Sequence, residues 1–260
     1  MNPATSLRYA HAFATILRKE ISRFMRIWLQ TILPPAITMG LYFIVFGNLI
    51  GPRIGTMHGF GYMQYIAPGI IMMSVITNSY SNVVSSLFGA KFQRHIEEIL
   101  VAPIPDILIV LGFVAGGVAR GIIVGAVVTA VAHCFTDLHV KSIPVTITVV
   151  VATATLFSLA GYINALLARK FDDISIVPTF VLTPLTYLGG VFYSIDLLPA
   201  FWQTVSLGNP ILYMVSAFRY GMLGVSDIDV RAALSVIGLF IAGLFAICLA
   251  MMKRGTGLRS

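Results

Sequence analysis

Charged residues are scarce in this sequence. Only 10% of the 260 residues are Asp, Glu, Lys or Arg, whereas 58% are hydrophobic; soluble domains carry about 25% charged residues. This scarcity excludes an ordinary soluble domain and predicts an all-α integral membrane protein. Cysteine is also rare, and Cys134 and Cys248 lie so far apart in the sequence that they indicate no disulfide framework.

Motifs that would indicate an enzyme are missing as well. The sequence contains no G-x-S-x-G nucleophile motif, and neither an H-E-x-x-H zinc motif nor a G-x-x-x-x-G-K-[ST] phosphate loop. We therefore expect no catalytic residue, no cofactor site and no metal site in this chain. One group of metal-ligand residue types follows the third apolar run, but its spacing matches no closed zinc site. It consists of His133, Cys134, Asp137 and His139.

A helix needs about 20 apolar residues to cross a bilayer, and six stretches of the sequence are long enough. We assign residues 1–260 to one transmembrane domain. The predicted spans are residues 28–50, 62–88, 106–133, 143–168, 174–194 and 231–252. Residues 197–218 are also uncharged, but Pro199 and Pro210 interrupt them. We interpret residues 195–224 as short re-entrant or interfacial helices on the outer side before the last span, buried in protein.

The basic residues are unevenly distributed between the two sides of these six spans. If the N-terminus is cytoplasmic, twelve of the 17 Lys and Arg residues lie inside, four lie outside, and Arg120 lies within a span. This bias follows the positive-inside rule, so we predict that both termini face the cytoplasm. The net charge of +7 reflects this orientation, and we expect no nucleic acid partner.

Polar side chains inside the spans are the first candidates for function. In the second span Asn78, Ser81 and Asn82 recur at helical spacing, which indicates either interhelical hydrogen bonds or a water-lined pathway. No span contains an Asp or Glu that could pair with Arg120, so this arginine is either a functional charge or a structural one.

Two spans carry packing signals. The third contains a ridge of small residues that would let another helix approach closely. This ridge comprises Gly112, Gly116, Gly117, Gly121 and Gly125. The fifth is interrupted by Pro178 and Pro184, and the hydroxyls of Thr183 and Thr186 could bond the backbone groups that the prolines free.

Two amphipathic segments lie outside the spans. Residues 1–27 predict an interfacial helix whose basic side suits anionic headgroups. Its apolar face comprises Phe13, Ile16, Leu17, Ile21 and Phe24, followed by Trp28. Residues 91–101 form a charged island between apolar runs, with Phe92, Ile96, Ile99 and Leu100 on one helical face. A helix this short needs a surface to pack on, so the island either lies on lipid headgroups or docks on a partner.

Five stretches of the sequence closely resemble the type-2 permease family of ATP-binding-cassette transporters. They are FMRIWLQTILPPAITMGLYFIVFGNLIG, PGIIMMSVITN, FGAKFQRHIEEILVAPIP, FDDISIVPTFVLTPLTYLGGVFYSIDLLPAFW and NPILYMVSAFRYG. The resemblance implies a multi-pass protein of the bacterial inner membrane that contacts lipids and pairs with a second copy of itself. It also implies two copies of a cytosolic ATPase subunit, which would bind the ATP and magnesium.

The resemblance assigns roles to particular segments. It implies that residues 1–27 form a connecting helix and that residues 91–101 form a coupling helix seated on the ATPase. The expected ATPase-coupling residues are Phe92, Gln93, Arg94, Ile96, Glu97 and Glu98. It further implies that the second and fifth spans border the translocation route. The expected pathway residues are Asn78, Ser81, Asn82, Arg120, Thr183, Thr186 and Tyr187.

The predicted function is therefore that of a non-enzymatic permease subunit, of an exporter type, driven by a separate ATPase. The alternative from another class is a channel or secondary carrier that needs no ATPase. Association with an ATPase discriminates between the two, since the chain has no phosphate loop of its own.

Overall fold

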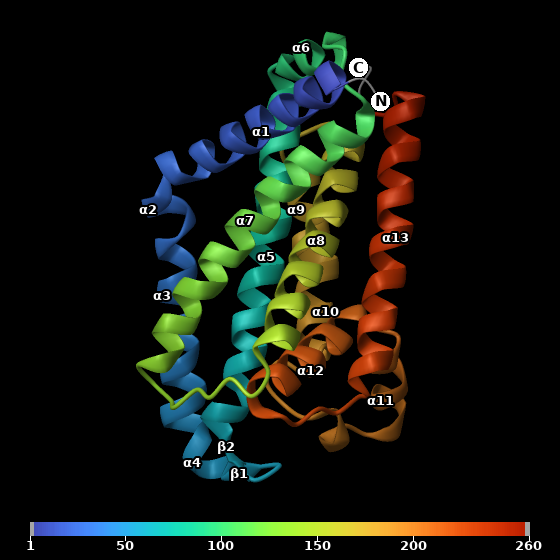
Figure 1. Ribbon diagram of the computed structural model, residues 1–260. Coiled ribbons are helices and arrows are strands. Elements are labelled where there is room, and N and C mark those ends of the chain that lie inside the picture. The colour runs from blue at the N-terminus through green and yellow to red at the C-terminus, as the bar shows by residue number, and fades with distance from the viewer. Residues whose placement is uncertain (1–2, 258–260) are drawn as a thin grey trace.

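The computed structural model describes residues 3–257, and these are mostly helical, with one short β-hairpin (Figure 1). The first half of the chain comprises α1 (Pro3–Arg26), α2 (Trp28–Thr31), α3 (Leu33–Tyr42), η1 (Phe43–Ile50), α4 (Gly51–Ile54), β1 (Thr56–Met57), β2 (Phe60–Gly61), α5 (Tyr62–Phe92), α6 (His95–Val101) and α7 (Asp106–His133). The second half comprises α8 (Ile143–Leu167), α9 (Asp173–Val177), η2 (Pro178–Leu182), α10 (Thr183–Leu188), η3 (Ile195–Leu197), α11 (Ala200–Leu207), α12 (Pro210–Leu223) and α13 (Val230–Arg254).

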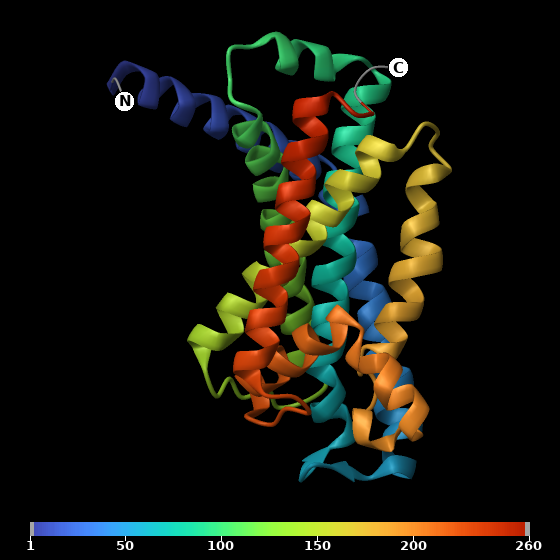
Figure 2. The ribbon, with the colours of Figure 1, turned by 90° about the vertical axis from the view of Figure 1, so that its right-hand side faces the viewer.

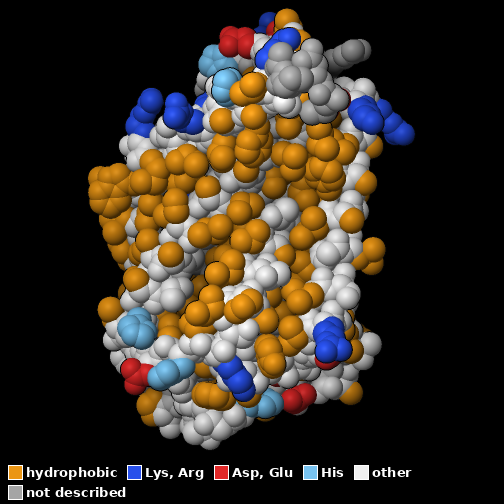
Figure 3. All heavy atoms as spheres, viewed as in Figure 1, with side chains coloured by type: hydrophobic (Ala, Val, Ile, Leu, Met, Phe, Trp, Pro, Cys, Tyr) orange, Lys and Arg blue, Asp and Glu red, His pale blue; other side chains and the backbone are white. Residues whose placement is uncertain are grey.

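The bundle has two distinct ends. At one end, which we call the α6 end, lie α6, α1 and the C-terminal end of α13 (Figure 1). At the other, the hairpin end, the antiparallel pair β1–β2 lies near α4 and α11. Figure 3 shows a band of hydrophobic side chains between these ends, and the charged side chains gather above and below it. Such a band is what a bilayer requires of the protein surface that it surrounds.

Four segments of the described chain are long and apolar enough to cross a membrane: Trp28–Ile54, Asp106–His133, Ile143–Leu167 and Val230–Arg254. These helices show an all-α integral membrane protein. The second predicted span lies in α5, whose 31 residues would extend about 46 Å, but polar residues dilute its apolar character. The fifth lies in the apolar helical stretch Asp173–Leu188, which is shorter than the usual ~20 residues.

Helix α5 runs through the centre of the bundle (Figure 2). Its residues belong to two apolar cores: Tyr65 and Ile70 to the one nearer the hairpin end, Leu87 and Phe88 to the one nearer the α6 end. Contacts along α5 are close, because a Cβ atom on Gly161 of α8 would lie 2.6 Å from the Tyr80 carbonyl oxygen. No side chain therefore separates the two helices at this crossing.

The predicted small-residue ridge of the third span is confirmed in α7. A Cβ atom on Gly116 would lie 2.5 Å from the Cβ of Glu20 in α1, and one on Gly112 would overlap Ile16. Farther along, Gly117 and Gly121 admit side chains of α5 and α8 in the same way. The ridge thus lets α7 contact three helices at short distance.

The uncharged stretch 197–218 consists of two helices in the structure. Helix α11 has 8 residues and α12 has 14, and both are too short to cross a bilayer. The break falls at Asn209, whose side-chain oxygen accepts a hydrogen bond from the Ile211 backbone N–H and so caps α12. Helix α12 is mostly buried, whereas Phe201 in α11 is 70% exposed.

Candidate functional site

The predicted coupling helix over residues 91–101 is interrupted. Lys91 and Phe92 end α5, a turn follows at Gln93 and Arg94, and α6 begins at His95. Arg94 adopts a left-handed conformation with φ of 62°, which is uncommon for a residue other than Gly, Asn or Asp. The turn lets α6 lie across the end of the bundle instead of continuing the line of α5 (Figure 2).

This geometry separates apolar side chains that the sequence placed on one face. Ile96 is only 1% exposed and packs in the core nearer the α6 end. Phe92 is 60% exposed, and its ring centroid lies 4.8 Å from that of Phe171. Ile96 therefore anchors α6 to the bundle. Phe92 and Phe171 form an exposed aromatic surface at the α6 end, which a partner protein or lipid could cover. The remaining coupling candidates, Gln93, Arg94, Glu97 and Glu98, are exposed.

Lys91 connects the end of α5 to the end of α8. Its ammonium donates hydrogen bonds to the carbonyl oxygens of Leu166, at 2.9 Å, and Ala168, at 2.6 Å. Carbonyls at a helix C-terminus lack intrahelical partners and carry partial negative charge, so a lysine there is favourable. Partial burial, and then the neighbouring Arg169, lower the pKa of Lys91, while Asp173 acts in the opposite direction. The ends of α5 and α8 are therefore linked through this one side chain.

A polar network joins α1 to the C-terminal half of α5. The Glu20 carboxylate is fully buried; one oxygen accepts a hydrogen bond from the Ser86 hydroxyl at 2.6 Å, and the other lies 3.3 Å from the Arg23 guanidinium. The same guanidinium donates to the side-chain oxygen of Asn82 at 2.8 Å and to its backbone carbonyl at 3.0 Å. The carboxylate and Asn82 thus share one arginine, as a buried charge requires.

Sequence reasoning missed the network on α1. The sequence did contain a signal of this network. Glu20 falls four residues after Ile16 and four before Phe24, so it belongs to the apolar face of α1. Ile16 and Phe24 lie on the predicted apolar face, and both are buried against the bundle. An acidic residue inside a buried stripe requires a partner, and Arg23, three residues farther on, lies close enough to provide one.

Arg120 lies close to this network on α7. Its guanidinium donates a hydrogen bond to the side-chain oxygen of Asn78 at 3.2 Å, and its Nε atom has no hydrogen-bond partner among residues 3–257. Asn78 in turn donates to the backbone carbonyl of Ser74. Within one chain, Asn78 and Asn82 therefore make contacts between helices, while Ser81 is half-buried.

The pathway candidates of the fifth span lie elsewhere. Thr183 and Thr186 donate hydrogen bonds to the carbonyl oxygens of Pro178 and Leu182, at 2.9 and 2.7 Å. Pro178 and Pro184 free the carbonyls of Ile174 and Phe180 instead, and the first of these accepts a hydrogen bond from Asn164 of α8 at 3.3 Å. Tyr187 is 47% exposed. In Figure 2 this segment and α7 flank opposite sides of α5. A single chain therefore does not bring the two groups of candidates together.

Comparison with known proteins finds a matching family and similar proteins. The family model described as ABC-2 type transporter matches residues 11–223. The chain is 60% identical over 252 residues to the inner membrane transport permease YadH of Escherichia coli strain K12, covering 97% of this chain and 98% of that protein. It is 24% identical over 215 residues to nodulation protein J of Rhizobium leguminosarum bv. viciae, covering 82% and 83%.

These matches extend over the polar network, the α6 turn and the short helices at the hairpin end. They confirm the resemblance on which the segment assignments depend. With its amphipathic α1, its apolar helices and a family match over most of its length, the chain belongs to the ABC-2 type transporter family.

Proposed function

We propose that this chain is the membrane-spanning permease subunit of an ATP-binding-cassette exporter of the inner membrane, driven by a separate ATPase. The observation that carries the proposal is the surface at the α6 end. Phe92 is exposed beside Phe171, and α6 is fastened to the bundle by the buried Ile96. An exposed aromatic anchor on a rigidly held element is the type of surface that a partner protein binds.

The charges around this surface fit a cytosolic partner. Glu97 and Glu98 lie in the first turn of α6 and are exposed, so they are free to pair with basic residues of an ATPase. ATP binds to that subunit, since this chain has no phosphate loop. A push on α6 would reach α5 through the turn at Arg94 and α8 through Lys91, which is a route for a rigid-body change between inward- and outward-facing states.

The proposed topology has six spans, with α5 and the segment Asp173–Leu188 added to the four apolar helices. The start of α1, the C-terminal end of α13 and α6 lie at the same end of the bundle (Figure 1), and the positive-inside bias indicates that this end is cytoplasmic. The hairpin end, with the re-entrant helices α11 and α12, then faces the periplasm.

A homodimer would complete the translocation pathway. Two apolar segments make few contacts with the rest of the chain, namely Trp28–Ile54 and Asp173–Leu188. Their exposed side chains include Leu29, Ile37, Leu41, Leu49, Ile176 and Phe180. A second copy that covers part of this surface, with lipid on the remainder, would let Thr183, Thr186 and Tyr187 of one copy approach the pathway of the other.

The test of the function is association with an ATPase. The full chain should be purified from native membranes through a C-terminal tag, in a lipid nanodisc, and the co-purifying proteins identified. We expect a cytosolic ATP-binding-cassette subunit in a one-to-one ratio with the chain, together with ATP hydrolysis. If the chain instead carries solutes across proteoliposomes without any ATPase, it is a channel or a secondary carrier.

The proposed orientation predicts a labelling pattern. Single cysteines are placed at Thr56 and Thr204 of the hairpin end and at Gln93 of the α6 end, all exposed, after Cys134 and Cys248 have been replaced by alanine. In intact cells an impermeant thiol reagent should label the first two and not Gln93→Cys, which should react only after the cells are opened. The reverse pattern would place α6 outside and end the coupling proposal.

A further inference from the structure

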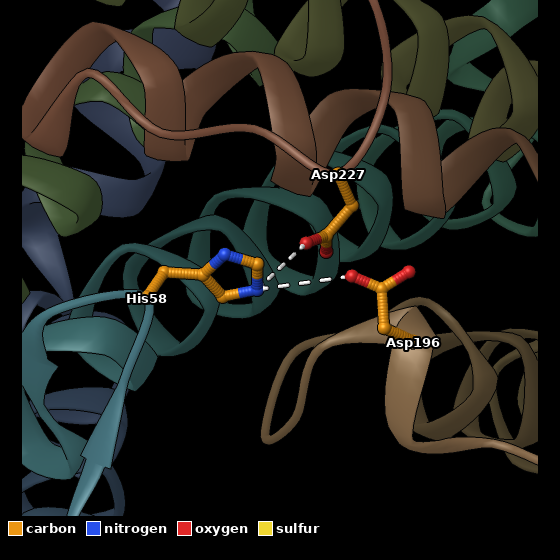
Figure 4. A group of neighbouring side chains, drawn as sticks. All are labelled: His58, Asp196 and Asp227. Carbon is orange, nitrogen blue, oxygen red and sulfur yellow. Dashed lines mark ion pairs between the residues drawn. The ribbon is translucent and has the colours of Figure 1, made fainter.

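Three segments of the hairpin end bring an imidazole and two carboxylates together. His58 lies in the turn between β1 and β2, Asp196 in η3, and Asp227 in the loop between α12 and α13 (Figure 4). The Nε2 atom of His58 is 3.9 Å from a carboxylate oxygen of Asp196 and 3.9 Å from one of Asp227. The three ligand atoms all lie within 4.8 Å of one another.

Asp227 is held in a fixed orientation. Its side chain is only 2% exposed, and its Oδ2 atom is 3.1 Å from the fully buried Arg219. Arg219 in turn donates to the carbonyl oxygen of Gly190 at 2.6 Å and lies 4.1 Å above the Tyr65 ring. The other oxygen, Oδ1, accepts a hydrogen bond from Ser194 and is the one that faces His58. The Tyr65 hydroxyl also donates to Oδ1, at 3.2 Å, so both carboxylate oxygens are anchored, and Oδ1 faces the imidazole.

We propose that His58, Asp196 and Asp227 bind a divalent transition-metal ion of the zinc type on the outer side of the protein. Neutral imidazole nitrogen together with carboxylate oxygen is a ligand set that suits zinc, whereas magnesium and calcium favour oxygen alone. Zinc ligands lie about 2 Å from the ion and thus about 3.3 Å from one another in a tetrahedral shell. The two 3.9 Å separations would need to shorten by about 0.6 Å, and the separation between the two carboxylates, which lies within 4.8 Å, by up to about 1.5 Å.

The side chains that must move are those with room to do so. Asp196 is 71% exposed and His58 is 41% exposed, so both can approach the fixed Asp227 oxygen. His58 also lines two open cavities, one with Asp227 and Tyr220 and the other with Asp196. These cavities give an ion access from the solvent and leave space for a water molecule as a fourth ligand.

Arg219 is not a ligand in this site but contacts one of the ligands, Asp227. Carboxylate ligands are commonly oriented by a second hydrogen-bonding group, and Arg219 does this for Asp227. Its positive charge also offsets part of the negative charge of the two aspartates, which lowers the affinity of the site for a cation. Because the ligands come from three separate segments, bound metal would join the β1–β2 hairpin to η3 and to the loop before α13.

The test uses the full chain in nanodiscs, with a tag that contains no histidine and after treatment with a chelator. Zinc chloride titrated into the wild-type protein should bind with one equivalent per chain in calorimetry and raise the melting temperature. His58→Ala and Asp196→Asn should each weaken binding by about tenfold or more. Both positions are exposed, so both variants should fold, as size-exclusion profiles will show.

His139→Ala is the matched control, because His139 is another exposed histidine, in the loop between α7 and α8. This variant should bind zinc like the wild type. Cobalt provides a second readout, since its visible absorption in the wild-type protein should be lost in His58→Ala. The proposal is wrong if wild-type protein binds no zinc, or if His58→Ala and Asp196→Asn bind it as tightly as His139→Ala does.

Discussion

Replacing Arg219 by alanine should remove most of the folded protein from the membrane. Arg219 is fully buried, forms an ion pair with the buried Asp227 and donates to the carbonyl oxygens of Gly190 and Tyr65. The variant leaves an uncompensated carboxylate in the interior, and breaking a buried pair in this way costs about 3–5 kcal/mol. We expect the monodisperse peak in fluorescence-detected size-exclusion chromatography to be lost.

Two further variants test whether loss of the Arg219–Asp227 ion pair causes the loss of the monodisperse peak. Arg231→Ala removes an exposed arginine at the start of α13 and should leave the peak unchanged. The double variant Arg219→Met with Asp227→Leu removes both charges and should accumulate better than Arg219→Ala, because no unpaired charge remains. If Arg219→Ala is as stable as Arg231→Ala, the ion pair does not hold the hairpin end together.

Replacing Phe92 by alanine should weaken ATPase binding without disturbing the fold. The side chain is 60% exposed, so little packing within the chain is lost. Truncation of an aromatic anchor at an interface commonly costs about 2 kcal/mol or more, which corresponds to roughly a 30-fold weaker association. We expect a matching loss of ATPase in pull-down experiments and of coupled hydrolysis in nanodiscs.

Phe201→Ala is the control for this experiment, since Phe201 is 70% exposed but lies in α11 at the opposite end. It should bind the ATPase normally. Glu98→Gln should have a smaller effect than Phe92→Ala, because charges at an interface rim contribute less. Ile96→Ala removes a buried side chain and should lower the stability of α6 instead. Equal binding by Phe92→Ala and the wild type would show that the partner does not dock on this residue.

The membrane class and the segment order were predictable from the sequence, because apolar run length and glycine spacing are local signals. The small-residue ridge containing Gly116 was found for this reason, although its partner, α1, could not be named. The sequence did not predict that Phe92 would be exposed and Ile96 buried. It depends on the left-handed turn at Arg94, where no glycine or asparagine marks a change of direction.

The polar clusters were the least predictable part of the protein. Arg219 and Asp227 are only eight residues apart, but His58 is brought to them by the tertiary fold alone. In the same way, Asn82 was predicted to face a pathway or another helix, and the choice of Arg23 as its partner required the position of α1. Hydrogen bonds between distant segments leave no periodic pattern that a single sequence can reveal.

The close crossing of α8 over α5 determines which parts of the molecule can move. Where Gly161 meets the Tyr80 carbonyl, two backbones touch, so neither helix can rotate about its own axis without a collision. Lys91 fastens the same two helices at the α6 end. We expect α5 and α8 to move as one rigid unit. The sparsely packed segments Trp28–Ile54 and Asp173–Leu188 would then shift relative to that unit.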